Sequence, residues 1–362
     1  MKPYIPARLP LKSLNWEEFI QPLGKTNREL ARYAGILQGI PNPAIFLSPL
    51  TTNEAVLSSR IEGTQATLEE VLKYEALPQK DAAKEQDIVE IINYRKSLDF
   101  AVDYMKKKPI SLNLIKEIHD RLLDSVRGRN KARGLFRTTQ NYIGRPGTPI
   151  GQASYIPPPP ENLPDLLDNL EKYIHYDEKD PLIQLAVVHA QFEIIHPFLD
   201  GNGRVGRILI PLFLVEKELL KSPVFYISAY LEANLDSYIS RLNEITSNNN
   251  WEGWIHFFLT AVAEQAKNNS DIALQVLHLY DSMKEQVADI TRSQHAIKVL
   301  DTIFKNPVFN SSAFVEETGI PRASAKRILQ ELRENKILTM VIDSAGKKPA
   351  VLQFSKLLEI VG

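Results

Sequence analysis

Apolar residues recur with a helical period along most of the chain, so the sequence predicts a mainly α-helical protein. The clearest case is an amphipathic helix over 84–105, in which Ile88, Ile91 and Leu98 share one face. The tetrapeptide TLEE at 67–70 predicts the start of another helix, because threonine followed three residues later by glutamate forms a capping box. Further helices are expected at 16–39, 48–62, 111–125, 161–175, 181–195, 203–220, 232–246 and 251–268.

Two segments lack this period. Residues 133–160 are crowded with glycine, proline and threonine, which favours two short extended pieces joined by a turn at Arg145-Pro146-Gly147. We expect this segment to form a β-hairpin flap that ends at the four prolines 157–160. Residues 1–15 are rich in proline and apolar residues, and they are expected to lie as an extended arm against the body.

The end of the chain has a different character. Residues 290–338 predict three helices, followed by short strands at 338–342 and 349–354. The turn around Gly319-Ile320-Pro321 lies between two helices, a pattern typical of a helix-turn-helix, and the turn between the strands suits the wing of a winged helix. The predicted domains are a helical region at 1–105, a core at 106–270, and at 271–362 a linker, itself helical in character, with a winged-helix domain.

Composition and charge exclude several classes of protein. The formal net charge is −1, so no global field attracts nucleic acid or an anionic membrane. The absence of cysteine excludes disulfides, thiolate metal sites and a cysteine nucleophile. No signal-like N-terminal segment and no apolar run of the ~20 residues that span a bilayer is present, so we expect a soluble, cytoplasmic protein.

One loop, HPFLDGNGRVGR at 196–207, interrupts two strongly apolar helical patterns. Pro197 ends the first helix, and Gly201 and Gly203 permit a tight turn and a close backbone approach by a ligand. The second helix is expected to begin near Asn202 or Gly203, so its unpaired N–H groups and positive dipole end point into the loop. Such a terminus is an anion site, and phosphate is the ligand that it suits.

The side chains of the loop extend this picture to a nucleotide. Arg204 and Arg207 lie one turn apart on the second helix and can reach one anion. Asp200 supplies a carboxylate for magnesium beside the phosphates, and His196 supplies a base that titrates near neutral pH. Any one of these residues alone is more often structural. Their joint occurrence in one loop predicts a phosphate-transfer site.

The loop resembles the Fic-domain signature, H-x-F-x-[D/E]-G-N-[G/K]-R followed by a second arginine, at every defined position. The segments GLFRTTQNYIG and YIPPPP resemble the flap of that family, and the resemblance covers about 45–270. It implies a protein adenylyltransferase that uses ATP and Mg²⁺ to move AMP onto a tyrosine, threonine or serine hydroxyl of a protein, itself included. Gly203 stands where the kinase branch of the family has lysine, which favours AMP transfer.

The resemblance also assigns roles. It makes His196 the general base and Asp200 the magnesium ligand, with Arg204 near the β-phosphate and Arg207 near the γ-phosphate of ATP. Gly201, Asn202 and Gly203 form the anion hole, Ile143, Gly144, Ile150 and Gly151 belong to a flap that pairs with the target chain, and Tyr230 and Asn234 contact adenine. For Tyr230 and Asn234, helix packing and an N-cap are an equally good interpretation.

The sequence SSRIEG at 58–63 resembles the inhibitory-helix motif of the same family, [S/T]-x-x-x-E-[G/N]. Ser58 and Glu62 share one helix face ahead of Gly63, and the resemblance places this helix at about 48–63. Glu62 can pair with Arg207 and so occupy the arginine that holds the γ-phosphate. The alternative is an ordinary surface carboxylate before a C-cap glycine.

Other functions remain open at this point. Residues 291–362 contain 11 basic and 7 acidic residues, and Arg322, Lys326 and Arg327, with Lys347 and Lys348 on the wing, are candidate DNA contacts. A winged helix also serves as a protein-interaction or dimer module, and homodimers are common among relatives. The chain is therefore an autoinhibited adenylyltransferase, a DNA-binding regulator that senses nucleotide, or a hydrolase that removes AMP. His119 and His189 are interpreted as packed histidines.

Overall fold

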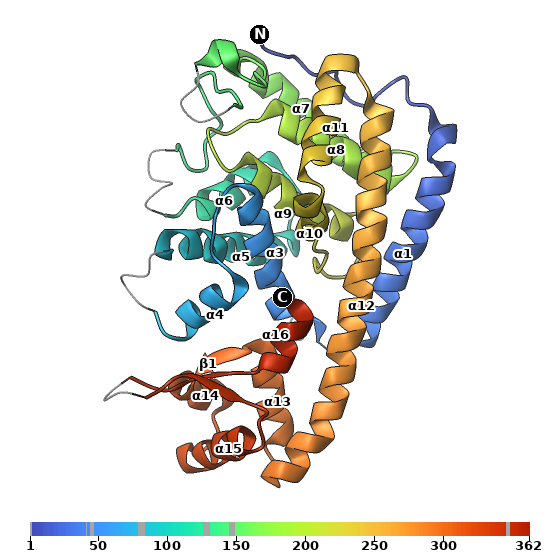
Figure 1. The fold of residues 1–362 in the computed structure, drawn as a ribbon. Coiled ribbons are helices and arrows are strands. Elements are labelled where there is room, and N and C mark those ends of the chain that lie inside the picture. The colour runs from blue at the N-terminus through green and yellow to red at the C-terminus, as the bar shows by residue number, and fades with distance from the viewer. Residues whose placement is uncertain are drawn as a thin grey trace.

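The computed structural model describes residues 2–40, 42–43, 47–78, 84–125, 131–144, 149–344 and 348–362. Figure 1 shows a helical body with a smaller C-terminal unit beneath it. The elements of the body are η1 (Trp16–Phe19), α1 (Ile20–Gly39), α3 (Ser48–Ile61), α4 (Leu68–Ala76), α5 (Glu85–Met105), α6 (Leu112–Leu122), η2 (Ile150–Gln152), η3 (Pro160–Asn162), α7 (Leu163–Ile174), α8 (Pro181–Ile195), α9 (Asn202–Glu216), α10 (Ser228–Ala233), α11 (Leu235–Asn248) and α12 (Trp251–Thr291).

The centre of the body is formed by α8 and α9. Nearly every residue of α8 is buried, because the helix is apolar on all sides and is surrounded by α7, α9, α11 and α12. Pro211 lies inside α9, which is also almost entirely buried. The loop at 196–201 is therefore held between two helices that are fixed by the core on both sides.

A single helix of 41 residues, α12, runs along one edge of the molecule beside α1 (Figure 1). The sequence predicted a helix at 251–268 followed by a linker, itself helical in character, near 268–290; the predicted helix end at 268 was wrong, because one helix runs through both segments. Buried residues continue through Val276, Met283 and Val287, so no change of burial marks a boundary. The helix ends only at Arg292, whose φ of 41° is left-handed.

Three other predictions concern the helix at 232–246, the capping box at Thr67 and the N-terminal arm. The expected helix at 232–246 is found as α11, and the short helix α10 precedes it and meets it at Asn234. The capping box at Thr67 is present, with Glu70 accepting from the Thr67 backbone N–H at 2.8 Å. The N-terminal arm is extended as predicted, and it is tied to the body by hydrogen bonds such as that from Tyr4 N to Ile156 O, 3.0 Å.

The predicted hairpin at 133–160 is much reduced in the described residues. One bridge joins Ile143 to Tyr155, and the second half forms η2 instead of a strand. The proline-rich composition explains this, because proline lacks the N–H that a continued ladder requires. The turn predicted at 145–147 lies outside the described residues.

The C-terminal unit contains α13 (Ala296–Lys305), β1 (Val308–Asn310), α14 (Ser311–Thr318), α15 (Arg322–Glu334), β2 (Thr339–Ile342), β3 (Val351–Gln353) and α16 (Ser355–Val361). The three predicted helices and both predicted strands are present. The sequence analysis missed β1 and α16, which are short. The strands form an antiparallel sheet in the order β1-β3-β2. In the described part of the chain, no helix is both long and apolar enough to cross a bilayer.

Candidate functional site

The loop between α8 and α9 is closed by its own asparagine. Asn202, which is buried, accepts from the Phe198 N–H at 2.8 Å and donates from Nδ2 to Phe198 O at 2.9 Å. Gly201 precedes the helix with a φ of 76°, a conformation that glycine adopts without strain. The first N–H groups of α9 have no partner within the helix, so the loop presents backbone donors to an anion.

His196 terminates α8 in the left-handed conformation, with φ 48° and ψ 61°. Its Nδ1 lies 3.3 Å from Glu193 O, so Nδ1 carries the proton and Nε2 is left as the acceptor. Burial lowers the pKa of His196 to about 4, and the imidazole is neutral at pH 7. The neutral imidazole has an acceptor nitrogen for a proton, but the expectation that His196 titrates near neutral pH was wrong, because burial disfavours its charged form.

Arg137 holds this loop against the base of the flap. Its Nε donates to His196 O at 2.9 Å and its Nη2 donates to Pro158 O at 2.6 Å, while its backbone N–H donates to Pro197 O at 2.9 Å. Burial lowers the pKa of Arg137 to about 10, which still leaves it charged at neutral pH. The sequence analysis missed this residue; its signal was a single arginine in the otherwise uncharged run LFRTTQNYIG.

Asp200 is the exposed carboxylate of the site, with 43% of its side chain accessible. Its Oδ1 accepts from the Gly201 N–H at 2.6 Å and lies 3.7 Å from Arg204 Nη2, and its Oδ2 lies 3.7 Å from Lys131 Nζ. Among the described residues, no group of three acidic or histidine side chains is placed to hold a metal ion. One exposed carboxylate beside an anion site fits magnesium, which uses one or two carboxylates together with substrate phosphates.

His119 supports the backbone of Asp200 from α6. Its Nδ1 accepts from the Gly134 N–H at 3.0 Å, so its Nε2 carries the proton and donates to Asp200 O at 3.0 Å. The ring stacks on Phe198 at 3.7 Å between centroids, and burial lowers the pKa of His119 to about 4. The predicted packed histidine is confirmed as buried, and it also joins the flap segment to the loop.

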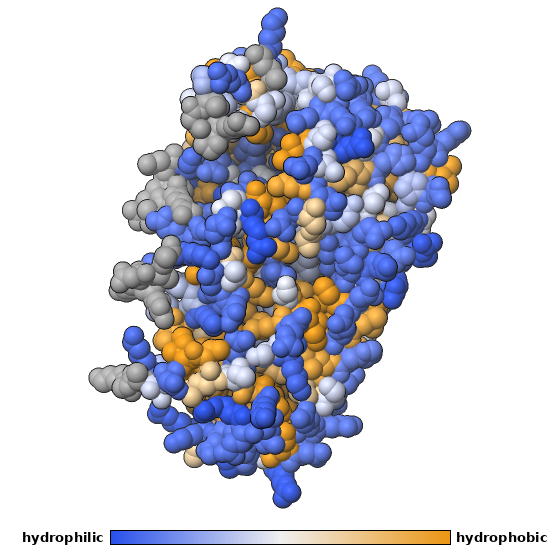
Figure 2. All heavy atoms as spheres, in the orientation of Figure 1, coloured by the Kyte–Doolittle hydropathy of each residue, from blue (hydrophilic) through white to orange (hydrophobic). Residues whose placement is uncertain are grey.

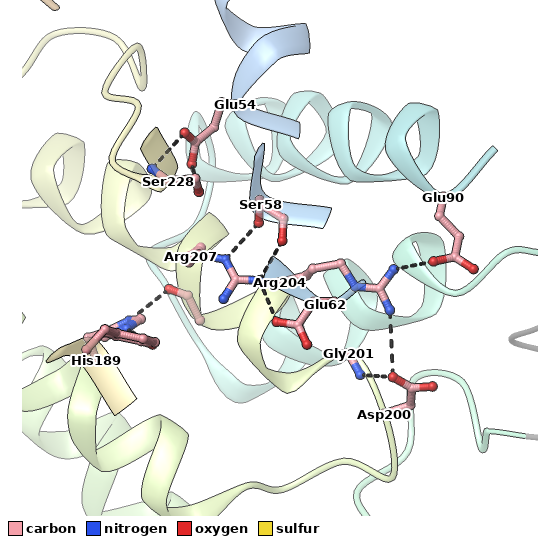
Figure 3. A network of polar contacts seen from close by, with 12 residues as sticks. Glu54, Ser58, Glu62, Glu90, His189, Asp200, Gly201, Arg204, Arg207 and Ser228 are labelled. Carbon is pink, nitrogen blue, oxygen red and sulfur yellow. Dashed lines mark hydrogen bonds and ion pairs between the residues drawn. The ribbon is translucent and has the colours of Figure 1, made fainter. Parts of the chain in front are cut away.

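Arg207 lies under the anion site and binds the C-terminal end of α3 (Figure 3). Its Nε donates to Ser58 Oγ at 2.8 Å, and its Nη2 donates to Ser58 O at 2.9 Å and to Glu62 Oε1 at 2.6 Å. Arg207 is 1% exposed, whereas 36% of the Glu62 side chain is accessible. Burial alone would raise the pKa of Glu62, but the charge of Arg207 outweighs it and the pKa is lowered.

Glycine at position 203 leaves room for the contact between Glu62 and Arg207. A Cβ placed on Gly203 would overlap Glu62 Oε1 and would lie 2.9 Å from Arg207 Nη1. Gly63, the last residue of the SSRIEG motif, has a φ of 99°, which lets the chain turn away directly after Glu62. The predicted pair of Glu62 with Arg207 is therefore present, and both neighbouring glycines permit it.

Two further acids position this site, and the sequence analysis missed both. Glu90 on α5 accepts from Arg204 Nη1 at 2.9 Å, and both side chains are largely buried. Glu54 on α3 accepts from the Ser228 N–H at 3.0 Å and from Ser228 Oγ at 2.6 Å (Figure 3), and burial raises its pKa to about 7. The spacing Glu54–Ser58–Glu62, one residue per helical turn, was the available signal.

The remaining candidates lie around the site or away from it. Ile143 donates its N–H to Tyr155 O at 2.8 Å, and the exposed flap candidates are Ile143, Gly144, Ile150 and Gly151. Tyr230 packs against Phe257, with ring centroids 6.0 Å apart. Asn234 stands at the start of α11 without a side-chain cap and donates to Tyr230 O at 2.9 Å. Both contacts fit helix packing, and the adenine contact stays a prediction.

In the C-terminal unit, the DNA candidates separate. Arg322, Lys326 and Lys348 line one groove, together with Arg333. Arg327 instead donates to Thr291 O at 3.1 Å and to Glu331 at 2.7 Å, so it faces the end of α12 and not the groove. Lys347 lies outside the described residues. His189 is packed as predicted, with Nε2 2.9 Å from Tyr238 Oη and burial lowering its pKa to about 3.

Two sequence profiles match the chain. The Fic/DOC family N-terminal profile matches residues 20–103 and the Fic/DOC family profile matches residues 109–214, so together they cover more than half of the chain. A probable protein adenylyltransferase of Aquifex aeolicus is 30% identical over 206 residues, which are 55% of this chain and 56% of that protein. Protein adenylyltransferase fic-1 of Caenorhabditis elegans is 30% identical over 42% of this chain and 28% of its own length.

Solved structures show the same fold. A Fic family protein from Desulfovibrio desulfuricans superimposes with a TM-score of 0.62 at 18% identity, covering 97% of this chain and 98% of that chain. Fic-1 from Caenorhabditis elegans gives a TM-score of 0.52 at 19% identity over 72% of each chain. The chain thus has a mainly helical fold of this kind with a small three-stranded sheet, while it spans only about half, or less, of the curated relatives' length.

Proposed function

Because the chain belongs to the Fic/DOC family, we propose that it is a protein adenylyltransferase that moves AMP from ATP to a hydroxyl of a protein side chain, its own included. The observation that carries the proposal is the neutral imidazole of His196 beside the N-terminus of α9 and the Asp200 carboxylate. The relatives named above as adenylyltransferases support it.

The reaction follows from the roles of these groups. The acceptor oxygen attacks the α-phosphorus of ATP and loses its proton to His196 Nε2, while the bond to the β-phosphate oxygen breaks and diphosphate leaves. Magnesium, when bound at Asp200, neutralises charge on the phosphates. The backbone donors at the start of α9 and Arg204, oriented by Glu90, stabilise the charge that develops on the leaving diphosphate.

The pair of Glu62 with Arg207 supports autoinhibition within the same proposal. Arg207 is the second arginine of the family signature, and Ser58 and Glu62 together accept from its Nε and Nη2. A γ-phosphate must displace the Glu62 carboxylate to reach Arg207, because both are anions that use the same donor. ATP is then held poorly or in a nonproductive pose until α3 moves.

Mass spectrometry after incubation with ATP and magnesium tests the transfer. The Glu62→Gly variant is expected to gain the mass of AMP on a hydroxyl side chain, and the wild type is expected to gain less. The variant Glu62→Gly with His196→Ala should gain none while still binding ATP, because the base is lost and the anion site remains. Transfer that survives His196→Ala, or no transfer by Glu62→Gly with any hydroxyl-bearing protein supplied, would contradict the proposal.

The groove of the C-terminal unit favours a second function, which is binding of duplex DNA by a winged helix. Arg322, Lys326, Arg333 and Lys348 converge on it from α15 and the strand region. A salt-dependent shift of duplex DNA by the full chain is expected, and Lys326→Glu should abolish it whereas Arg327→Glu should weaken it much less. Equal effects of the two substitutions would argue against this groove.

A further inference from the structure

The helix that carries Ser58 and Glu62 is also held by the C-terminal unit. Asn53 on α3 donates from Nδ2 to Val361 O, the last residue of α16, at 2.8 Å. The neighbours of Asn53, Glu54 and Thr52, accept hydrogen bonds from Ser228 and Arg95 of the body. The helix α3 is therefore bonded to the body and to the C-terminal unit. The end of the chain thus reaches a helix that is about 300 residues earlier in the sequence.

The next helix, α4, is attached to the same unit. Asn310 at the end of β1 donates from Nδ2 to Ala76 O at 2.7 Å, and β1 packs along α4. Leu68, the first residue of α4, lies beside Gly362. Glu62 and Gly63 are therefore in the short connection between two helices that both contact the C-terminal unit (Figure 1).

An open pocket lies at the junction between body and C-terminal unit. A cavity of about 710 Å³ lies between them, lined by residues of α3 and α5 on one side and of α13, β1 and α14 on the other. Figure 2 shows hydrophobic side chains collected along this junction on the face that is drawn. The pocket is open to solvent, and α3 meets the C-terminal unit only at its rim, through α13 and α16, whereas the main attachment of the unit is to α12.

We propose that the C-terminal unit sets the strength of the autoinhibition, which we call the brake, exerted by Glu62 on Arg207. Its contacts through Asn53 and Asn310 hold α3 and α4 where Glu62 meets Arg207. This proposal rests on the proposed autoinhibited transferase and adds what controls the inhibition. Glu62 follows the last residue of α3 directly, so a displacement of α3 moves its carboxylate away from Arg207. Weakening the junction is expected to release the brake without any change in the residues that bind ATP.

The basic groove offers a route by which a ligand acts on this junction. Ser311 and Ser312 line the groove and directly follow Asn310, and the Asn310 side chain also caps α14 through the Ser312 and Ala313 N–H groups. A polyanion seated on these residues is one residue away from the contact with α4. A ligand in the groove would therefore lie next to the residue that contacts α4.

The test uses asparagine-to-aspartate substitutions in the full chain. Asn53→Asp and Asn310→Asp keep the side-chain shape and, for Asn310, the cap of α14, but each replaces the donor to a carbonyl with a repelling oxygen. Asn27→Asp, at an exposed position of α1, is the matched control. Amide hydrogen exchange of residues 48–63 and the rate of AMP transfer are the two measurements.

The double variant Asn53→Asp/Asn310→Asp is expected to exchange faster at 48–63 and to transfer AMP about two- to tenfold faster than the wild type, as loss of hydrogen bonds of ordinary strength allows. In the Glu62→Gly background the same substitutions should add no further rate, because the brake is already absent. Unchanged exchange at 48–63, faster exchange across the whole chain, or an equal gain in both backgrounds would overturn the proposal. If Glu62→Gly transfers no AMP at all, the proposed function fails, while the exchange measurement still decides this inference.

Discussion

Replacing Glu62 by glycine removes one anion from a buried arginine and leaves the nucleotide site otherwise intact. Arg207 keeps its two hydrogen bonds to Ser58, so α9 and the loop stay in place. Glu62 occupies the C-cap position after α3, with φ −91° and ψ 4°, which glycine also adopts. The substitution therefore frees Arg207 for a γ-phosphate without distorting the backbone.

The size of the effect follows from the contact. A hydrogen bond between charged groups contributes ~1.5–3 kcal/mol when buried, and an exposed ion pair contributes ~0.2–1 kcal/mol. With Arg207 buried and about a third of Glu62 exposed, we expect about 1–2 kcal/mol for the pair. This corresponds to about a 5- to 30-fold increase in the fraction of molecules that bind ATP productively.

The assay is the initial rate of AMP incorporation from α-labelled ATP at a fixed magnesium concentration. Glu62→Gln should give a smaller increase than Glu62→Gly, since it removes the charge but keeps the volume beside Gly203. Ser58→Ala should change the rate less than either, because the ion pair remains. The control is Glu69→Gln, an exposed acid of α4 paired with Lys73. Equal rates for wild type, Glu62→Gly and Glu69→Gln, with His196→Ala inactive, would refute the brake.

Two further predictions follow from the buried histidines. His119→Phe keeps the ring on Phe198 but loses the bonds to Asp200 O and Gly134 N. We expect half-maximal activity to require about a tenfold higher magnesium concentration, with a matching loss of magnesium affinity in calorimetry with ATP present. His278→Phe, exposed on α12, is the control, and unchanged magnesium affinity would contradict the role. Burial lowers the pKa values of His119, His189 and His196 from 6.5 to about 4, 3 and 4, respectively. Between pH 6.5 and pH 4 the unfolded chain therefore binds more protons than the folded chain. The free energy of unfolding should fall as the pH falls, by ~1.4 kcal/mol per pH unit for each proton. Denaturant unfolding at several pH values checks this, and His189→Gln should reduce the slope whereas His278→Gln should not.

Much of the fold was predictable because the helices bury apolar faces with a regular period. The loop at 196–207, the capping box at Thr67 and the pair of Glu62 with Arg207 also followed from local spacing and from the family resemblance. What the sequence could not supply were contacts between distant segments. Glu90 reaches Arg204 across 114 positions and Asn53 reaches Val361 across 308, and no local pattern encodes either distance.

The other wrong or missing predictions also depended on contacts between distant segments. The end of a helix was predicted near residue 268, but the burial of α12 continues to the C-terminal unit, so tertiary contacts decided its length. Arg327 was a candidate DNA contact together with Arg322 and Lys326, and only its hydrogen bond to the end of α12 shows that it does not line the groove. The short strand β1 exists because β3 and α4 border it, which a three-residue segment cannot reveal alone.

The hydrogen atom that serves as the side chain of Gly203 has a consequence for how proteins of this kind can diversify. Any larger group at that position would occupy the space where the Glu62 carboxylate now lies. A protein of this kind with a bulky residue there would have to place its acid differently to keep the contact with Arg207. The residue at 203 thus bears on the charge that faces Arg207, because a larger side chain there would require the Glu62 carboxylate or the Arg207 guanidinium to shift.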